Sequence, residues 1–303
     1  MPGDRSGSTP GLIAAIAANV TLAIGPWLVR LAETGPVATG FWRLALAMPA
    51  MLAWSALANP GALRKGRAFW PVLLVAGLAF AADLATWNVS IHRTTLANAT
   101  LFANSATLIY PVYGFLIARA WPSRPQVAAL LLAMLGGGLL LGRSAELSPA
   151  HLVGDLLALF AGLAYAVYFI GMARVRAAVP PMPALALSGV ATMAPLLLLA
   201  IALGERLVPG DLAGWGTLAA LALVSQLLGQ GLMIYALGRL PPLVIGITLL
   251  IQPVVAGSIG WIAYGERPGL PDLLGALLVA AALVLVRREP EVAPAARATR
   301  SDA

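Results

Sequence analysis

The chain of 303 residues is too apolar and too weakly charged to form the surface of a soluble globular protein. Hydrophobic residues make up 60% of it, charged residues only 10%, and the mean hydropathy is +0.88, whereas soluble domains carry about 25% charged residues. The formal net charge of +7 therefore indicates basic loops beside an anionic membrane surface rather than a nucleic-acid-binding protein. The lack of cysteine excludes disulfide and thiolate chemistry.

Charged residues, prolines and polar clusters divide the chain into ten apolar segments. Most reach the ~17–20 residues that a helix needs to cross the hydrocarbon core, and they are apolar on all sides. A β-barrel would need alternating polarity instead, so the sequence predicts an all-α membrane protein with ten transmembrane helices. In chain order the segments cover residues 11–31, 36–57, 68–90, 94–118, 126–142, 152–173, 184–203, 212–237, 241–264 and 270–286.

The distribution of basic residues predicts the orientation of these segments. If the amino terminus is cytoplasmic, thirteen Lys and Arg residues fall on the cytoplasmic side and five on the outer side, which favours both termini in the cytoplasm. The first segment is expected to be a true span rather than a cleaved signal, and residues 289–303 a disordered cytoplasmic tail. Lys65 is the only lysine, a bias typical of a GC-rich bacterial genome, so we expect a bacterial inner-membrane protein.

One phrase occurs twice in the chain. Residues 108–126 read LIYPVYGFLIARAWPSRPQ, and residues 250–269 read LIQPVVAGSIGWIAYGERPG. The copies lie in the fourth and ninth segments, which predicts two five-helix repeats, residues 1–146 and 147–288. Because five is odd, the second repeat enters the membrane from the opposite side. Such inverted-topology repeats usually place a substrate site near the bilayer midplane between the halves.

Several short motifs are arranged along the chain in an order that is similar to a known transporter family. They are Phe-Trp-Arg at 41–43, the repeated Pro of the fourth and ninth segments, and Gly-Glu-Arg at 265–267. With the five-plus-five segments, they resemble the EamA family of the drug/metabolite transporter superfamily. Within that family the chain as a whole looks most like the YddG-type aromatic amino-acid exporters, although no single motif identifies this subfamily. The first repeat departs from the family pattern with Pro-Ser-Arg at 122–124. The resemblance implies small-molecule transport, often export.

The duplicated prolines are Pro111 and Pro253. A proline within a helix removes one hydrogen bond and leaves a carbonyl one turn earlier without its donor. At matching positions of inverted repeats, the two prolines are expected to act as paired hinges or to expose carbonyls to a cavity. The alternative is a pair of static kinks.

Polar and aromatic side chains within the spans are candidates for a substrate cavity. A polar group in lipid costs free energy unless it finds a partner. Amides and hydroxyls could bind a zwitterion, and rings could stack on an aromatic substrate; the alternatives are bonds between helices and simple packing. The candidates are Asn98, Ser105, Tyr110, Gln226, Gln230, Thr248 and Gln252 among polar residues, and Trp87, Phe102, Tyr165 and Tyr168 among aromatic ones.

Two opposite charges lie deep in neighbouring segments. Arg43 and Asp83 are each about 10 Å from the outer end of their span, at 1.5 Å per residue. Because an isolated charge in lipid is costly, we expect them to meet, directly or through water. The pair would be either a static ion pair or a proton-binding or gating element. Asp155 is expected only to cap its helix, and Glu266 and Asp272 to be solvated.

These observations predict a secondary transporter that exports small amphiphilic metabolites by alternating access. Aromatic or large apolar amino acids are the first expected substrates. A drug or other metabolite exporter of the same superfamily is the alternative. Sugar phosphates would require several deep cations and polyamines several deep acids, whereas only Arg43 and Asp83 are deep. An intramembrane enzyme is a remote alternative, because the sequence has no phosphate-binding loop, protease motif or metal motif. We expect a monomer in the lipid bilayer, a small-molecule substrate, protons as a possible coupling ion, and no cofactor, metal or nucleic acid.

Overall fold

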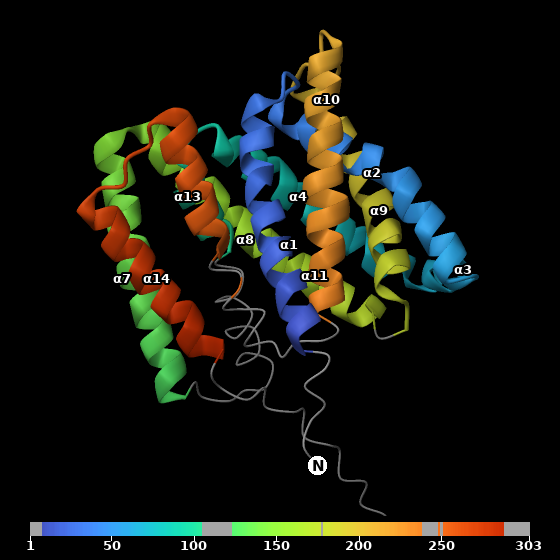
Figure 1. Cartoon of the computed structure of the whole chain (residues 1–303), viewed down its shortest axis with the longest axis horizontal. Coiled ribbons are helices and arrows are strands. Elements are labelled where there is room, and N and C mark those ends of the chain that lie inside the picture. The colour runs from blue at the N-terminus through green and yellow to red at the C-terminus, as the bar shows by residue number, and fades with distance from the viewer. Residues whose placement is uncertain (1–7, 105–122, 177, 238–247, 249–250, 288–303) are drawn as a thin grey trace, which may run out of the picture.

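The computed structural model describes residues 8–104, 123–176, 178–237, 248 and 251–287, and these residues form helices joined by turns and short loops (Figure 1). Each of the ten expected segments contains part of at least one of them. The bounds are α1 (Ser8–Leu31), α2 (Pro36–Ala58), α3 (Ala62–Gly66), η1 (Arg67–Phe69), α4 (Trp70–Ile91), α5 (Leu96–Ala103), α7 (Arg124–Leu147), α8 (Pro149–Arg176), α9 (Pro181–Ala202), α10 (Leu212–Leu221), η2 (Ala222–Gly229), α11 (Gln230–Leu237), α13 (Ile251–Tyr264) and α14 (Leu270–Arg287).

Six described helical stretches are long and apolar enough to cross a membrane, which makes the chain a multi-pass membrane protein. α7 and α14 contain shorter apolar stretches, Val127–Leu140 and Leu270–Ala282. Parts of the fourth and ninth segments lie outside the described residues. The total of ten spans therefore stays a prediction.

The helices pack in a pattern that links early and late parts of the chain. α1 packs against α11 and α13, while α8 packs against α4 and α5. α2 packs against α9, α5 against α13, and α7 against α14. In Figure 1 the α7–α14 pair stands at one side of the molecule, and α1 lies beside α10 and α11. Helices from residues 1–146 thus contact helices from residues 147–288 throughout the described structure.

Among the described residues, five apolar clusters fill the spaces between these helices. The largest joins α2, α4, α8 and α9 through residues such as Leu44, Leu84 and Leu196. Another joins α5, α7, α8 and α14 and includes Phe102 and Leu140. Many other large apolar side chains face outward, which is the arrangement expected of helices whose solvent is lipid.

Small residues allow α7 and α14 to approach closely. A Cβ atom added at Gly136 would lie 2.7 Å from the Gly275 carbonyl oxygen and 2.9 Å from Leu278 Cβ. Close backbone approach at small residues is a common basis of helix association in membranes. On the same helix, a Cβ at Gly138 would have no atom within 4 Å.

We expect Gly136→Ala and Gly138→Ala to change stability in opposite directions. The added methyl at position 136 must push α14 away, at a cost of about 1–3 kcal/mol. At position 138 it gains up to about 1 kcal/mol of helix propensity. Thermal unfolding of the purified protein in detergent measures both, and equal melting temperatures for the two variants would contradict the close α7–α14 contact.

Candidate functional site

Five helical elements bring charged, amide and aromatic side chains together between residues of the two expected repeats. α2 and α4 come from the first repeat, and α8, η2 and α11 from the second. We call this set the central cluster, and it unites seven residues expected from the sequence to bind substrate or to pair. Its members are Arg43, Asp83, Trp87, Tyr165, Tyr168, Gln226 and Gln230, with Phe80 packed against the tyrosines.

Arg43 is 3% exposed and contacts Gln226 on η2 and Trp87 on α4. Its Nε donates a hydrogen bond to Gln226 Oε1 at 3.1 Å, and its guanidinium carbon lies 6.0 Å from the centre of the Trp87 ring. Gln226 belongs to a π-helical stretch, η2, within the eighth expected span. π-Helical turns are rare and frequently occur at functional sites, because they change the register of the side chains that follow.

Arg43 and Asp83 form no direct ion pair among the described residues. Asp83 is 7% exposed, and the two charges interact electrostatically. Among the described residues, however, no Arg43 nitrogen lies within 4.0 Å of the Asp83 carboxylate. The physical reason is that Gln226 and the face of Trp87 hold the guanidinium instead. Contact through water stays a prediction.

Aromatic rings from α4 and α8 stack within the central cluster. Phe80 and Tyr168 lie 4.5 Å apart at an interplanar angle of 18°, and Tyr165 and Tyr168 lie 5.7 Å apart at 21°. The Tyr168 hydroxyl is 3.3 Å from Ser188 Oγ on α9, and a side-chain hydrogen bond joins Tyr165 to Gln230. These rings therefore face the protein interior rather than lipid.

Asn98 and Gln252, which are also expected to line the cavity, form hydrogen bonds outside the central cluster. Asn98 donates to the Asp155 carboxylate at 3.2 Å, and the Thr94 hydroxyl also bonds that carboxylate. Asp155 is fully buried, so it joins α8 to α5 and its neighbouring loop rather than only capping its own helix as expected. Gln252 donates to Asn19 Oδ1 at 2.7 Å and joins α13 to α1.

The remaining predicted residues are only partly described. Phe102 is buried in the apolar core that contains α7 and α14, so it packs outside the central cluster. Thr248 is buried, and Pro253 lies half-buried in the first turn of α13. Ser105, Tyr110 and Pro111 lie outside the described residues, so the paired hinges stay a prediction.

Glu266 is not solvated as expected but pairs with Arg30 at the end of α1. Arg30 also donates to the carbonyls of Ile91 and Thr94, and its guanidinium lies 4.7 Å from the centre of the Tyr264 ring. Glu266 in turn accepts the Leu96 N–H at the start of α5, at 3.0 Å. This ion pair therefore connects α1, the α4–α5 loop and the turn after α13.

A second turn also places a glutamate at the start of another helix, and this similarity was not predicted from the sequence. Gly-Glu-Arg occurs at 204–206 as well as at 265–267. Gly204 and Gly265 both adopt left-handed backbone, φ +65° and +66°, where α9 and α13 end. Glu205 accepts the N–H groups of Val37 and Ala38 at the start of α2, at 3.3 and 2.9 Å. Comparing the two identical tripeptides would have predicted a shared role.

We expect Glu266→Gln to destabilise the protein more than Glu33→Gln. The first change leaves Arg30, whose side chain is 12% exposed, without its charged partner, at a cost of about 2 kcal/mol or more. Glu33 lies 3.6 Å from Arg206 in a pair whose side chains are 55% and 38% exposed, and such pairs contribute at most about 1 kcal/mol. Thermal unfolding in detergent compares them, and equal losses would contradict a special role for the Arg30–Glu266 pair.

The chain is similar to a known protein family over most of its length. The EamA-like transporter family matches residues 9–142 and 152–288. Two curated relatives are the threonine/homoserine exporters RhtA of Salmonella typhimurium strains SL1344 and LT2, each 30% identical over 167 residues. Those matches cover 54% of this chain, which spans about half the length (56%) of each relative.

One crystal structure of a protein is similar across nearly the whole chain. The TM-score is 0.63, the sequence identity is 20%, and the match covers 93% of this chain and 96% of the other. At this identity the likeness shows the fold alone.

Proposed function

Because the chain belongs to the EamA-like transporter family, we propose that it exports aromatic or large apolar amino acids as a secondary transporter. The observation that carries this proposal is the central cluster. It combines one buried cation and one buried acid with stacked rings, between helices of both expected repeats. An amphiphilic molecule with a charged end and an apolar side chain matches that combination.

The charges of the central cluster favour a neutral or zwitterionic substrate. Arg43 is the one Lys or Arg buried in the described part of the chain. A phosphorylated substrate would require several such cations. The acid next to Arg43 also disfavours a strongly anionic substrate, and the single acid disfavours a polyamine.

A second candidate function is export of small hydroxylated amino acids. The RhtA relatives are threonine/homoserine exporters. The stacked Phe80, Tyr165 and Tyr168 rings favour larger apolar side chains instead.

Alternating access between two inverted repeats is the proposed mechanism. Two sets of helix contacts support it: α1 packs on α11 and α13, and α8 packs on α4 and α5. A two-fold relation between residues 1–146 and 147–288 would exchange α1 with α8, α11 with α4 and α13 with α5, and would therefore convert one set of contacts into the other. Pro111 and Pro253 are the proposed hinges. We further propose an inner-membrane location with both termini cytoplasmic, a monomeric carrier, and protons as the ion to test for coupling.

Counterflow in proteoliposomes tests the substrate class. Vesicles that contain the protein and are loaded with unlabelled tryptophan, phenylalanine or leucine are expected to accumulate the labelled amino acid. Vesicles of the same lipid without the protein serve as the control. Exchange of threonine and homoserine alone would favour the second candidate. Exchange of cationic dyes without any amino acid would overturn both and favour drug export.

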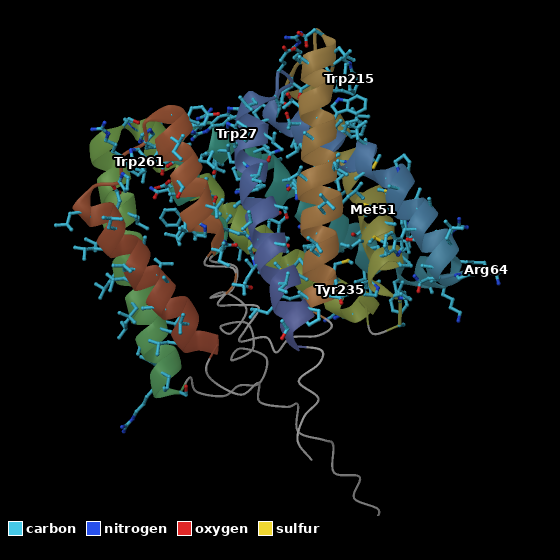
Figure 2. All side chains as sticks on the ribbon, in the orientation of Figure 1. Trp27, Met51, Arg64, Trp215, Tyr235 and Trp261 are labelled. Carbon is cyan, nitrogen blue, oxygen red and sulfur yellow. The ribbon has the colours of Figure 1, made fainter. Side chains whose placement is uncertain are left out.

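Tyr165→Leu tests the contribution of the aromatic rings. Loss of a ring–ring contact is worth about 0.5–1.5 kcal/mol, so we expect KM for tryptophan to rise roughly 2- to 12-fold and KM for leucine to change less. Trp261→Leu is the matched control, because Trp261 is 60% exposed on α13 (Figure 2). Equal changes for tryptophan and leucine would contradict stacking on the substrate.

A further inference from the structure

Two buried opposite charges lie near each other in the central cluster without touching. Arg43 and Asp83 are both more than nine-tenths buried, and each burial costs several kcal/mol unless the charge is paired. Among the described residues, the only hydrogen bond that Arg43 makes uses Nε, and the Asp83 carboxylate makes none. The terminal guanidinium nitrogens and the carboxylate therefore remain available to a third group.

A second, independent polar group beside them also lacks a partner. Trp87 Nε1 is fully enclosed and has no hydrogen-bond acceptor among the described residues. Trp87 follows Asp83 by one helical turn on α4, and its ring faces the Arg43 guanidinium. Arg43 and Asp83 are 3% and 7% exposed, so a small part of each residue is accessible.

We infer that Arg43 and Asp83 bind the two ends of one zwitterionic α-amino acid. The Arg43 guanidinium binds the carboxylate, the Asp83 carboxylate binds the ammonium, and the amino-acid side chain lies against the cluster's rings. This inference rests on the proposed function and adds the recognition chemistry of its site.

The geometry of Arg43 suits a carboxylate. A guanidinium presents a planar fork of donors that matches two carboxylate oxygens. Because Gln226 holds Nε at 3.1 Å, the orientation of the fork is fixed while its outer nitrogens remain free. No Arg43 nitrogen lies within 4.0 Å of the Asp83 carboxylate, so the two charges do not satisfy each other by direct contact.

Binding would also connect the two expected repeats. Arg43 and Asp83 belong to the first repeat, whereas Gln226, which orients Arg43, belongs to the second. A ligand lacking one charged end would leave the opposite protein charge buried and unpaired. We therefore expect each such analogue to bind at least about 100-fold more weakly than the complete amino acid.

An analogue series tests this inference on the full-length wild-type protein. The competitors are tryptophan, its decarboxylated amine tryptamine, and its deaminated acid indole-3-propionate, measured against labelled tryptophan in detergent. A parallel series in counterflow uses threonine, the amine that remains after its decarboxylation, and the hydroxy acid that remains after its deamination. We expect only complete amino acids to compete in whichever series is active. Equal competition by the amine and the acid would overturn the inference.

Two variants assign the roles of the two charges. Asp83→Asn is expected to weaken tryptophan binding until tryptophan and indole-3-propionate bind with equal affinity, because the ammonium group is no longer required. Arg43→Gln is expected to do the same for tryptamine. Glu33→Gln, an exposed acid remote from the cluster, is the control. Unchanged selectivity in folded variants would overturn the assignment, whereas loss of folding leaves the wild-type series to decide.

The same experiments separate this inference from the proposed function. If only the threonine series is active but requires both charged ends, the aromatic preference fails and the zwitterion site stands. If tryptophan exchanges but its amine and acid compete equally, export of amino acids stands and the inference fails. If no amino acid binds or exchanges, both fail.

Discussion

A polar group inside the hydrocarbon of a membrane costs free energy unless it finds a partner, and hydrogen bonds between buried side chains join several helices here. Asp155 meets Asn98 and Thr94, so α8 lies against α5. Gln252 meets Asn19, so α13 lies against α1. Apolar side chains cannot supply this specificity alone, because lipid tails are as apolar as leucine.

The Phe-Trp-Arg motif at 41–43 shows how one helical turn serves three different environments. Phe41 packs against the core of α4, α8 and α9. Trp42 donates its Nε1–H to the Leu207 carbonyl and meets Trp215 edge-on at 4.8 Å, near one end of α10 (Figure 2). Arg43 points to Gln226. Successive residues of a helix differ by about 100° in direction, so one turn connects the α9–α10 loop to the central cluster.

Membrane helices could be predicted from the sequence because length and hydropathy are local properties. The central cluster was also largely predictable, since deep charges and amides are rare in such segments. The partners of Asn98 and Phe102 were not predictable, for a different reason. Which neighbour meets a given helix face depends on tertiary packing, and a single sequence does not contain that information. The π-helical turn around Gln226 likewise has no sequence signature that we could identify.

The two Gly-Glu-Arg turns have a consequence for biogenesis. Glu205 reaches the start of α2 across 167 residues, and Glu266 reaches the start of α5 across 170. At ribosomal rates of about 5–20 residues per second, the glutamates are synthesised roughly 10–30 s after the helix starts whose N–H groups they accept. During that time the headgroup water of the bilayer must hydrate the amide groups. The early spans are therefore inserted before the structure that completes them has been translated.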